Sequence, residues 1–324
     1  MKKLEELKEK VLDGGLISRE EALMLTDAPL EELAAAADEI RRKTAGNGFD
    51  LCTIVNGKCG RCSEDCKYCA QSAHYQADCP DSYPLLDTEK LLAGAKHNER
   101  QGVLRYSIVT SGKRLSDAEV DQVCESIRTI KKETSIEICV SFGLLSEDAF
   151  RKLKQAGASR VHCNLESSER YFKEICTTHT YEEKIKTLKA AKKAGLSLCS
   201  GGILGLGETM EDRIDMVLTA RDLGVKSIPV NLLNPIPGTP YEHNRPLTNE
   251  EARRFTAIFR FLIPDASIRL AGGRGLLGDK GEACLKSGAN AAISGDMLTT
   301  AGITVETDLK LIKKLGFEVK LYNG

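Results

Sequence analysis

The sequence predicts an α/β protein built as a (β/α)8 barrel of the TIM type, preceded by an N-terminal helical extension. From residue 51 onward, short apolar segments alternate with segments of helical periodicity, an order that produces parallel strands with helices outside them. Eight such strand segments span about 245 residues, the usual length of a closed barrel. An open doubly wound sheet is disfavoured, because no strong GxGxxG motif opens the first helix.

The expected strands are residues 51–55, 104–109, 136–142, 160–165, 197–204, 227–233, 266–270 and 291–294. The helical segments between them include residues 117–133, 146–156, 181–194, 210–223, 248–262 and 280–287. Several of these helices begin after Ser, Thr or Asp and end at Gly, the residues preferred at the two ends of a helix. Residues 301–324 are expected to form a final helix and a short extended tail.

Residues 1–48 are expected to form the helical extension. Ser18 and Glu21 have the spacing of a capping box, which predicts a helix start. A second helix is expected to begin near Thr26, to run to Lys43 and to end at the Gly-Asn-Gly sequence that follows. Since no Gly/Ser- or Pro-rich linker follows, residues 49–324 are expected to form one barrel domain with the C-terminal helix and tail.

Composition indicates a soluble enzyme-sized chain and excludes several classes of protein. The 324 residues are 41% hydrophobic with a formal net charge of -1, and no basic block favours nucleic-acid binding. The chain has no signal-peptide pattern and no apolar run long enough for a membrane helix, so no membrane association and a cytoplasmic location are expected. In that reducing compartment, the twelve cysteines are not expected to form disulfides.

The strongest motif is the C-x3-C-x2-C spacing of Cys62, Cys66 and Cys69, directly after the first expected strand. Three thiolates on one loop can hold a cubane iron–sulfur cluster and leave its fourth iron open to a small chelating molecule. A structural zinc site is disfavoured, because only one CxxC pair is present and no H-x3–5-H pair follows. Catalytic groups of a barrel lie at the carboxyl ends of its strands, which is where this loop begins.

Three later strands carry reactive side chains whose alternation would turn them into the barrel. Taken singly, Cys139 and Cys199 are each more often packing residues of the barrel interior than ligands of a bound group. Arg269 is different, because an arginine inside a barrel needs an anionic partner. The glycine-rich run from Gly201 to Glu208 has two interpretations. It either brings backbone close to a bound cofactor or forms a tight turn with Glu208 as a first-turn helix acid.

These motifs together resemble the radical S-adenosylmethionine superfamily and, within it, the biotin synthase family. The resemblance covers about residues 50–300. It rests on the stretches that begin Cys62-Ser-Glu-Asp-Cys-Lys-Tyr-Cys, Thr177-Thr-His-Thr-Tyr, Cys199-Ser-Gly-Gly-Ile-Leu-Gly-Leu-Gly-Glu, Pro229-Val-Asn-Leu-Leu, Gly238-Thr-Pro and Arg269-Leu-Ala-Gly-Gly-Arg.

The resemblance implies a radical sulfurtransferase that converts dethiobiotin to biotin. A [4Fe–4S] cluster on Cys62, Cys66 and Cys69 would bind S-adenosylmethionine, and one electron would release a 5′-deoxyadenosyl radical. A second, sacrificial auxiliary iron–sulfur cluster would supply the sulfur. The resemblance further implies a flavodoxin- or ferredoxin-type reductant and a homodimer.

The resemblance also assigns individual residues. Tyr68, Gly201, Gly202, Glu208, Glu166 and Ile236 would bind the cofactor, and Asn164, Asn231, Thr299 and Thr300 the substrate. Cys139, Cys199 and Arg269 match three of the four ligands of the family's auxiliary [2Fe–2S] cluster.

The fourth auxiliary ligand departs from the family pattern, because Ser107 stands where a cysteine is expected and a serine oxygen is a poorer ligand for iron. Cys59 and Cys79 flank the first motif as extra thiols. We therefore hypothesise a four-iron auxiliary cluster on Cys59, Cys139 and Cys199 with Cys79 or Arg269.

Three other functions compete with this one. A hydrogenase maturase of the same superfamily needs no sulfur donor, and Cys139, Cys199 and Arg269 disfavour it. Lipoyl synthase is disfavoured because residues 1–50 contain no cysteine. A non-catalytic iron–sulfur electron carrier or sensor would need neither the glycine-rich run nor a full barrel.

Overall fold

The centre of the computed structural model is a closed barrel of parallel strands; the structure describes residues 2–60, 62–77, 79 and 81–322. In chain order the strands are β1 (Gly48–Lys58), β2 (Arg105–Thr110), β3 (Glu137–Ser141), β4 (Ala158–His162), β5 (Ser197–Cys199), β6 (Gly202–Leu204), β7 (Ser227–Leu232), β8 (Ser267–Leu270), β9 (Ala291–Ser294) and β10 (Glu318–Val319). Because β1 pairs with both β2 and β9, the sheet has no open edge there, and the predicted (β/α)8 barrel is confirmed.

The expected strand 197–204 is divided into β5 and β6, which both pair with β7. The break follows from very close packing of backbone at the Gly-Gly pair. A Cβ atom on Gly201 would lie 2.1 Å from the carbonyl oxygen of Pro229, and one on Gly202 would lie 2.3 Å from that of Glu166. Only glycine permits this approach of neighbouring strands.

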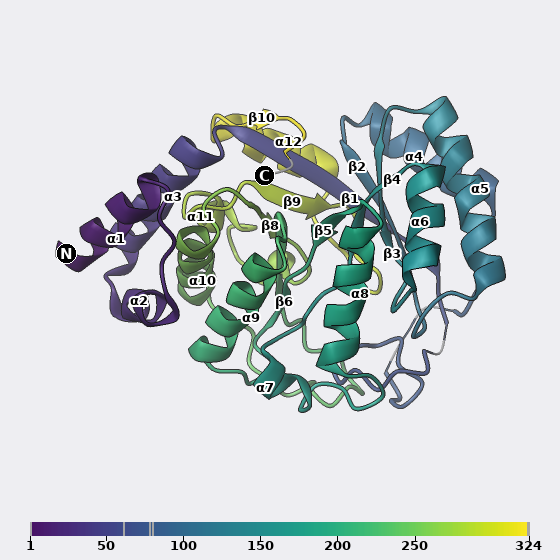
Figure 1. Cartoon of the computed structure of the whole chain (residues 1–324), viewed down its shortest axis with the longest axis horizontal. Helices are drawn as coiled ribbons and strands as arrows, with labels where there is room; N and C mark the ends of the chain where they lie inside the picture. The colour runs from purple at the N-terminus through teal and green to yellow at the C-terminus, as the bar shows by residue number, and fades with distance from the viewer. Residues whose placement is uncertain (1, 61, 78, 80, 323–324) are drawn as a thin grey trace.

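Helices surround the barrel, and most begin with a Ser, Thr or Asp cap as the sequence predicts (Figure 1). In chain order they are α4 (Thr88–Arg100), α5 (Asp117–Glu133), α6 (Glu147–Ala156), α7 (Glu169–Phe172), α8 (Tyr181–Lys193), α9 (Met210–Asp222), α10 (Asn249–Leu262), the 3-10 turn η2 (Arg274–Leu276), α11 (Glu282–Leu285) and α12 (Val305–Lys314). The buried apolar faces of these helices and the outward faces of the strands form one core.

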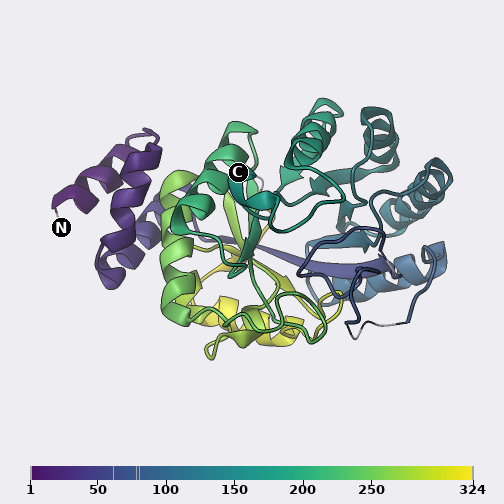
Figure 2. The same cartoon turned by 90° about the horizontal axis from the view of Figure 1, so that it is seen from below.

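The N-terminal residues form α1 (Lys2–Leu12), α2 (Arg19–Met24), the 3-10 turn η1 (Leu25–Asp27) and α3 (Leu30–Thr44). The capping box of Ser18 and Glu21 is present. The second expected helix begins at Leu30 instead of Thr26, because Pro29 keeps the residue before it out of the helical region. These helices lie on one side of the barrel beside α10 and outside the ring of barrel helices (Figure 2).

The C-terminal segment covers the amino end of the barrel. After α12, β10 pairs with the first residues of β1, and the carbonyl oxygen of Tyr322 accepts a hydrogen bond from Arg160 inside the barrel. The last two residues of the predicted tail, 323–324, and Met1 of the predicted extension lie outside the described residues. Among the described helices, none has both the length and the apolar character needed to cross a membrane.

Candidate active site

A cavity of about 410 Å³ lies inside the barrel and under the loops at the carboxyl ends of the strands. It brings together residues that are far apart in the sequence, as expected for a barrel active site. Of the residues proposed from the sequence, those that line it are Cys62, Cys66, Tyr68, Cys69, Cys139, Asn164, Glu166, Cys199, Asn231, Ile236, Arg269, Thr299 and Thr300.

The loop after β1 carries the C-x3-C-x2-C motif and is fastened to its neighbours by backbone hydrogen bonds. The N–H of Gly112 donates to the sulfur of Cys62 at 3.2 Å. The N–H of Lys67, between the other two thiols, donates to the carbonyl oxygen of Ile175 at 3.0 Å. With Cys62, Cys66 and Cys69 all partly exposed to the cavity, this loop can present three thiols to one cluster.

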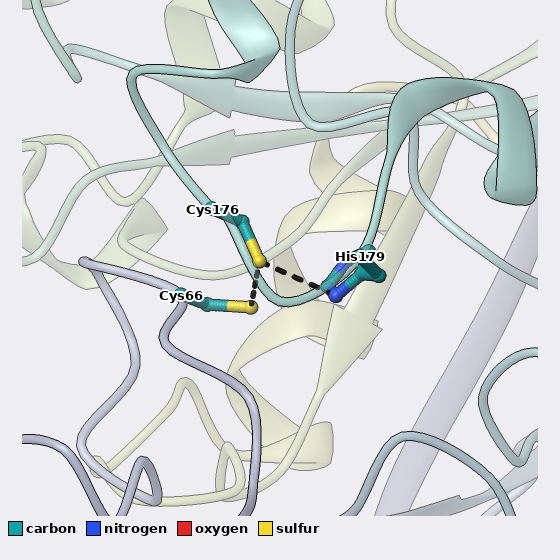
Figure 3. A group of neighbouring side chains, drawn as sticks. All are labelled: Cys66, Cys176 and His179. Carbon is teal, nitrogen blue, oxygen red and sulfur yellow. Dashed lines mark hydrogen bonds between the residues drawn. The ribbon is translucent and has the colours of Figure 1, made fainter.

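Cys66 faces two residues to which the sequence assigned no role (Figure 3). Its Sγ lies 3.8 Å from the Sγ of Cys176, which lies 3.3 Å from Nδ1 of His179. The same ring nitrogen is 2.6 Å from a carboxylate oxygen of Glu64. Both residues belong to the segment between α7 and α8, on which the cluster loop packs.

Glu166 presents an unsatisfied carboxylate oxygen to the cavity. Its backbone has a left-handed φ of 70°, which a residue with a side chain rarely adopts without a functional reason. Tyr68 donates a hydrogen bond to Oε1 at 3.0 Å, whereas Oε2 is buried and has no hydrogen-bond partner. Burial, together with the Glu166 charge, raises the pKa of Tyr68, which therefore stays a hydrogen-bond donor.

The buried ammonium group of Lys184 is a second cavity feature that the sequence did not predict. It comes from α8, and its Nζ lies 4.0 Å from Oε1 of Glu166. Burial lowers the pKa of Lys184, but the nearby Cys163, Glu166 and Cys66 outweigh it, and the pKa is raised. The group is thus a fixed positive charge at the cavity wall.

Beneath the cavity, three arginines converge on the fully buried carboxylate of Asp50. Arg105 binds it through Nε at 2.8 Å and 3.0 Å, and Arg269 and Arg160 approach it to 3.1 Å and 3.8 Å. Burial raises the pKa of Asp50, but the three guanidinium charges outweigh it and hold the pKa below its ordinary value. Three cations against one anion leave an excess of positive charge at the barrel floor.

Three thiols lie above this charge, and one of them is not among those proposed from the sequence. Cys52 of β1 lies beside Cys139 of β3, and its thiol donates a hydrogen bond to the carbonyl oxygen of Thr53 at 3.4 Å. The thiol of Cys199 donates to Oγ of Ser227 at 3.3 Å. The neighbouring thiol of Cys52 and the nearby arginines lower the pKa of Cys139, which favours its thiolate form.

Other proposed residues lie away from the cavity lining, namely Cys59, Cys79, Gly201, Gly202 and Glu208. Cys59 is buried just beyond β1, and its backbone pairs with Tyr83. The carboxylate of Glu208 accepts hydrogen bonds from the N–H groups of Gly205 and Leu206 and pairs with Arg213 at 2.5 Å. The glycine-rich run therefore uses Glu208 to hold its own turn.

The proposed substrate residues are held by backbone contacts. The amide of Asn231 donates to the carbonyl oxygen of Gly202 at 3.0 Å and accepts from the N–H of Gly272 at 3.0 Å. The side-chain oxygen of Asn164 accepts from the N–H of Gly201 at 3.1 Å. Both side chains are thus fixed in orientation at the cavity wall, which suits groups that must position a ligand.

Comparison with known proteins places the chain among iron–sulfur enzymes. Residues 58–220 match the family model of the Radical SAM superfamily, and residues 229–318 match that of the Biotin and Thiamin Synthesis associated domain. The biotin synthase of Brachyspira hyodysenteriae is 56% identical over 98% of this chain and 95% of its own length. Biotin synthase 2 of Corynebacterium diphtheriae is 57% identical, with coverages of 98% and 96%.

Solved structures of lower identity share the fold. Methylornithine synthase superimposes with a TM-score of 0.84 at 18% identity and covers 97% of both chains. The FeFe-hydrogenase maturase from Carboxydothermus hydrogenoformans has a TM-score of 0.83 at 16% identity, covering 98% of this chain and 79% of that one. At these identities the likeness concerns the barrel alone.

Proposed function

The chain belongs to the biotin synthase family of radical S-adenosylmethionine enzymes, and on that premise we propose that its cavity binds S-adenosylmethionine and dethiobiotin and inserts sulfur to form biotin. One observation carries the proposal. A single cavity is lined by the cluster-loop thiols at its mouth and by a second set of thiols among the strands. A radical reaction with a sulfur donor needs both sets beside one substrate.

The first metal group is a [4Fe–4S] cluster held by Cys62, Cys66 and Cys69. The residues fit it, because three thiols of one short loop face the cavity and leave one iron for a chelating ligand. When bound, the cluster would supply the electron for reductive cleavage of S-adenosylmethionine to the radical that removes hydrogen from the substrate. The protein's own contribution is to orient both molecules and exclude water.

Four residues are proposed to hold S-adenosylmethionine. The unsatisfied Oε2 of Glu166 can accept a hydrogen bond from a ribose hydroxyl. The ammonium of Lys184 can pair with the carboxylate of the methionine portion, since a buried cation favours an anionic partner. Tyr68, which donates a hydrogen bond to Glu166, would contact the adenine. Ile236 also lines the cavity and would contact the cofactor.

The substrate is proposed to lie between the two sets of thiols. Asn231 and Asn164, fixed by backbone hydrogen bonds, would face the ureido ring. The hydroxyl groups of Thr299 and Thr300, on the loop after β9, would bind the carboxylate. The barrel wall around them is largely apolar, which suits an aliphatic chain.

For the auxiliary cluster we propose Cys52, Cys139, Cys199 and Arg269 as ligands. Cys52 takes the place given to Cys59 in the sequence-based hypothesis, because it lines the cavity and reaches Cys139. The excess positive charge around Asp50 supports the fit, since a cluster on three thiolates is anionic. We retain the hypothesis of a four-iron auxiliary cluster. With Cys52 on β1 in place of a cysteine at position 107 on β2, the thiols are arranged differently from those that hold the family's two-iron cluster.

Product analysis tests the function. Reconstituted protein should convert dethiobiotin to biotin, and S-adenosylmethionine to 5′-deoxyadenosine and methionine, when given a reductant; mass spectrometry detects each. Formation of 5′-deoxyadenosine without biotin would contradict sulfur insertion, and absence of both would contradict radical chemistry. An iron count of about eight per chain supports two four-iron clusters, whereas about six supports a two-iron auxiliary cluster.

The electron donor and the assembly state are proposed from family membership. A flavodoxin or ferredoxin should replace chemical reductant in the same assay. A homodimer should give about twice the chain mass of 35.4 kDa in light scattering.

A further inference from the structure

Cys176 and His179 have no part in the proposed reaction, although they lie beside one of its cluster ligands. Cys176 is buried within hydrogen-bond range of both Cys66 and His179, and the ligand atoms of all three lie within 4.8 Å of one another. Among the described residues this is the group of cysteine, histidine and carboxylate side chains whose spacing suits a single metal ion. Figure 3 shows the two sulfur atoms and the imidazole nitrogen converging from two separate loops.

The separations agree with those of ligands on one tetrahedral ion. Two thiolates at about 2.3 Å from a zinc ion lie about 3.8 Å apart, and a thiolate and an imidazole nitrogen lie about 3.6 Å apart. The corresponding separations here are 3.8 Å for Cys66 and Cys176 and 3.3 Å for Cys176 and His179. Little side-chain movement would be needed to place an ion among the three.

Carboxylates beside the three ligands add to the attraction for a cation. Oδ1 of Asp65 lies 3.1 Å from the sulfur of Cys176, and its position is fixed by the N–H groups of Thr177 and Thr178. A carboxylate oxygen of Glu64 lies 2.6 Å from Nδ1 of His179. In the present arrangement it can accept a hydrogen bond from Nδ1–H, and a metal ion bound to Nδ1 would replace that hydrogen bond. Either carboxylate, or a water molecule, can complete four-coordination.

We propose that Cys66, Cys176 and His179 form a second, mononuclear site for a thiophilic divalent cation, ferrous iron or zinc, in the chain that lacks its first cluster. Binding replaces the protons of the two thiols and the proton or hydrogen bond at Nδ1 by bonds to the metal, with no change of oxidation state. Cys66 is shared with the [4Fe–4S] cluster, so the mononuclear ion and the cluster exclude each other. This exclusion rests on the proposed function; the mononuclear site itself does not.

Cobalt(II) is the probe for this site, because tetrahedral thiolate coordination gives it intense visible bands and a thiolate charge-transfer band. The full chain, prepared without clusters under anaerobic conditions, should bind one cobalt ion with this spectrum. Cys176→Ser should weaken that binding by about 100-fold or more, since even an outer-shell partner of a metal is worth roughly 10- to 100-fold. His179→Gln, which changes no thiol, should weaken it and shift the visible bands.

Two matched variants separate this site from adventitious binding by the cluster motif. Cys69→Ser removes a cluster ligand and should bind cobalt as the unmodified chain does. Cys124→Ser removes a buried thiol of α5, far from the loop, and should also leave binding unchanged. The opposite pattern, cobalt lost in Cys69→Ser and kept in both Cys176→Ser and His179→Gln, would overturn the proposal.

The chain that carries its first cluster provides the remaining test. It should give no cobalt spectrum of this type, because Cys66 is then bound to iron. An unchanged spectrum in that protein would show that Cys66 does not serve the cluster, and it would contradict the proposed function while leaving the mononuclear site in place. Absence of tetrahedral cobalt in the cluster-free chain would overturn the mononuclear site alone.

Discussion

Cys52 on β1 and Cys139 on β3 are neighbouring buried thiols on the two sides of the intervening strand β2, and each shifts the pKa of the other. Ser107 of β2 lines the same cavity and is in register with Cys139. The thiol that the family pattern places on β2 therefore has a counterpart one strand away. On the proposed assignment, Cys52 would supply the thiol that Ser107 lacks.

The first prediction concerns that counterpart. Cys52→Ser should lose the auxiliary cluster, because one of three thiol ligands is removed, while about four irons remain on the first motif. Biotin formation should cease, and release of 5′-deoxyadenosine should continue. Iron analysis, Mössbauer spectra and product assays measure these three results.

Two further variants serve as controls for Cys52→Ser. Cys59→Ser should keep its auxiliary iron, because Cys59 does not line the cavity. Adding Ser107→Cys to Cys52→Ser should restore part of the auxiliary iron by returning a thiol to β2. Full auxiliary iron in Cys52→Ser alone, or its loss in Cys59→Ser, would count against the assignment.

The second prediction concerns the buried carboxylate of Asp50. Asp50→Asn leaves three arginines without their anion and should lower the free energy of unfolding by about 3–5 kcal/mol. Urea unfolding of the cluster-free chain measures the change. Asp222→Asn, on the exposed end of α9, is the matched control and should change stability by less than about 0.5 kcal/mol. Equal stability of the two variants would refute the role given to Asp50.

The third prediction concerns cofactor binding by Glu166. Glu166→Gln replaces a charged acceptor by a neutral amide and should weaken S-adenosylmethionine binding about tenfold, since a charge-assisted hydrogen bond is worth roughly 1–2 kcal/mol more than a neutral one. Calorimetric titration of the reconstituted protein gives the affinity. Glu169→Gln, on an exposed residue three positions away, should bind as the unmodified protein does. Unchanged affinity in Glu166→Gln would remove Glu166 from the cofactor site.

The fourth prediction is a pH dependence at Asp212, which fastens the segment carrying Glu166 to α9. Burial raises the pKa of Asp212, but hydrogen bonds from Ser168, the N–H of Thr209 and Arg170 outweigh it and bring the pKa from 3.8 to about 2. A pKa lowered by folding stabilises the protein above the unfolded value and loses that contribution as the pH falls through the folded value.

Asp212→Asn should therefore lower the free energy of unfolding by about 2 kcal/mol at pH 6. The difference from the unmodified chain should shrink between pH 4 and about pH 2. Chemical unfolding of the cluster-free chain across this pH range measures it. A difference that does not depend on pH would show that the carboxylate charge has no part in the effect.

The sequence predicted the parts of the site that local spacing determines. The thiols of Cys62, Cys66 and Cys69 share one loop, and the alternation of the strands turned Cys139 and Arg269 inward as expected. Strand boundaries also followed local pattern, apart from the break at Gly201, which depends on the backbone of Pro229 from another strand.

The remaining site residues depend on the third dimension. The sequence favours Cys59 for the auxiliary cluster because it adjoins the first motif, but β1 runs to Lys58 and Cys59 does not line the cavity. The sequence does contain a signal for Cys52. It lies in the first expected strand, two residues after Asp50, so the alternation of side chains places both on the same face of β1. Lys184 and Cys176 have no such signal, because helix and loop packing alone brings them to the site.

Closure of the barrel by β9 has a consequence for the order in which the protein matures. The cluster loop is complete once residue 69 has been synthesised, whereas Arg269 and the strands that seal β1 are among the last segments to emerge from the ribosome. The proposed pocket for the auxiliary cluster is therefore complete only once β8 and β9 have been added to the chain. The proposed auxiliary cluster needs nearly the whole barrel, whereas the proposed ligands of the first cluster lie within one short loop.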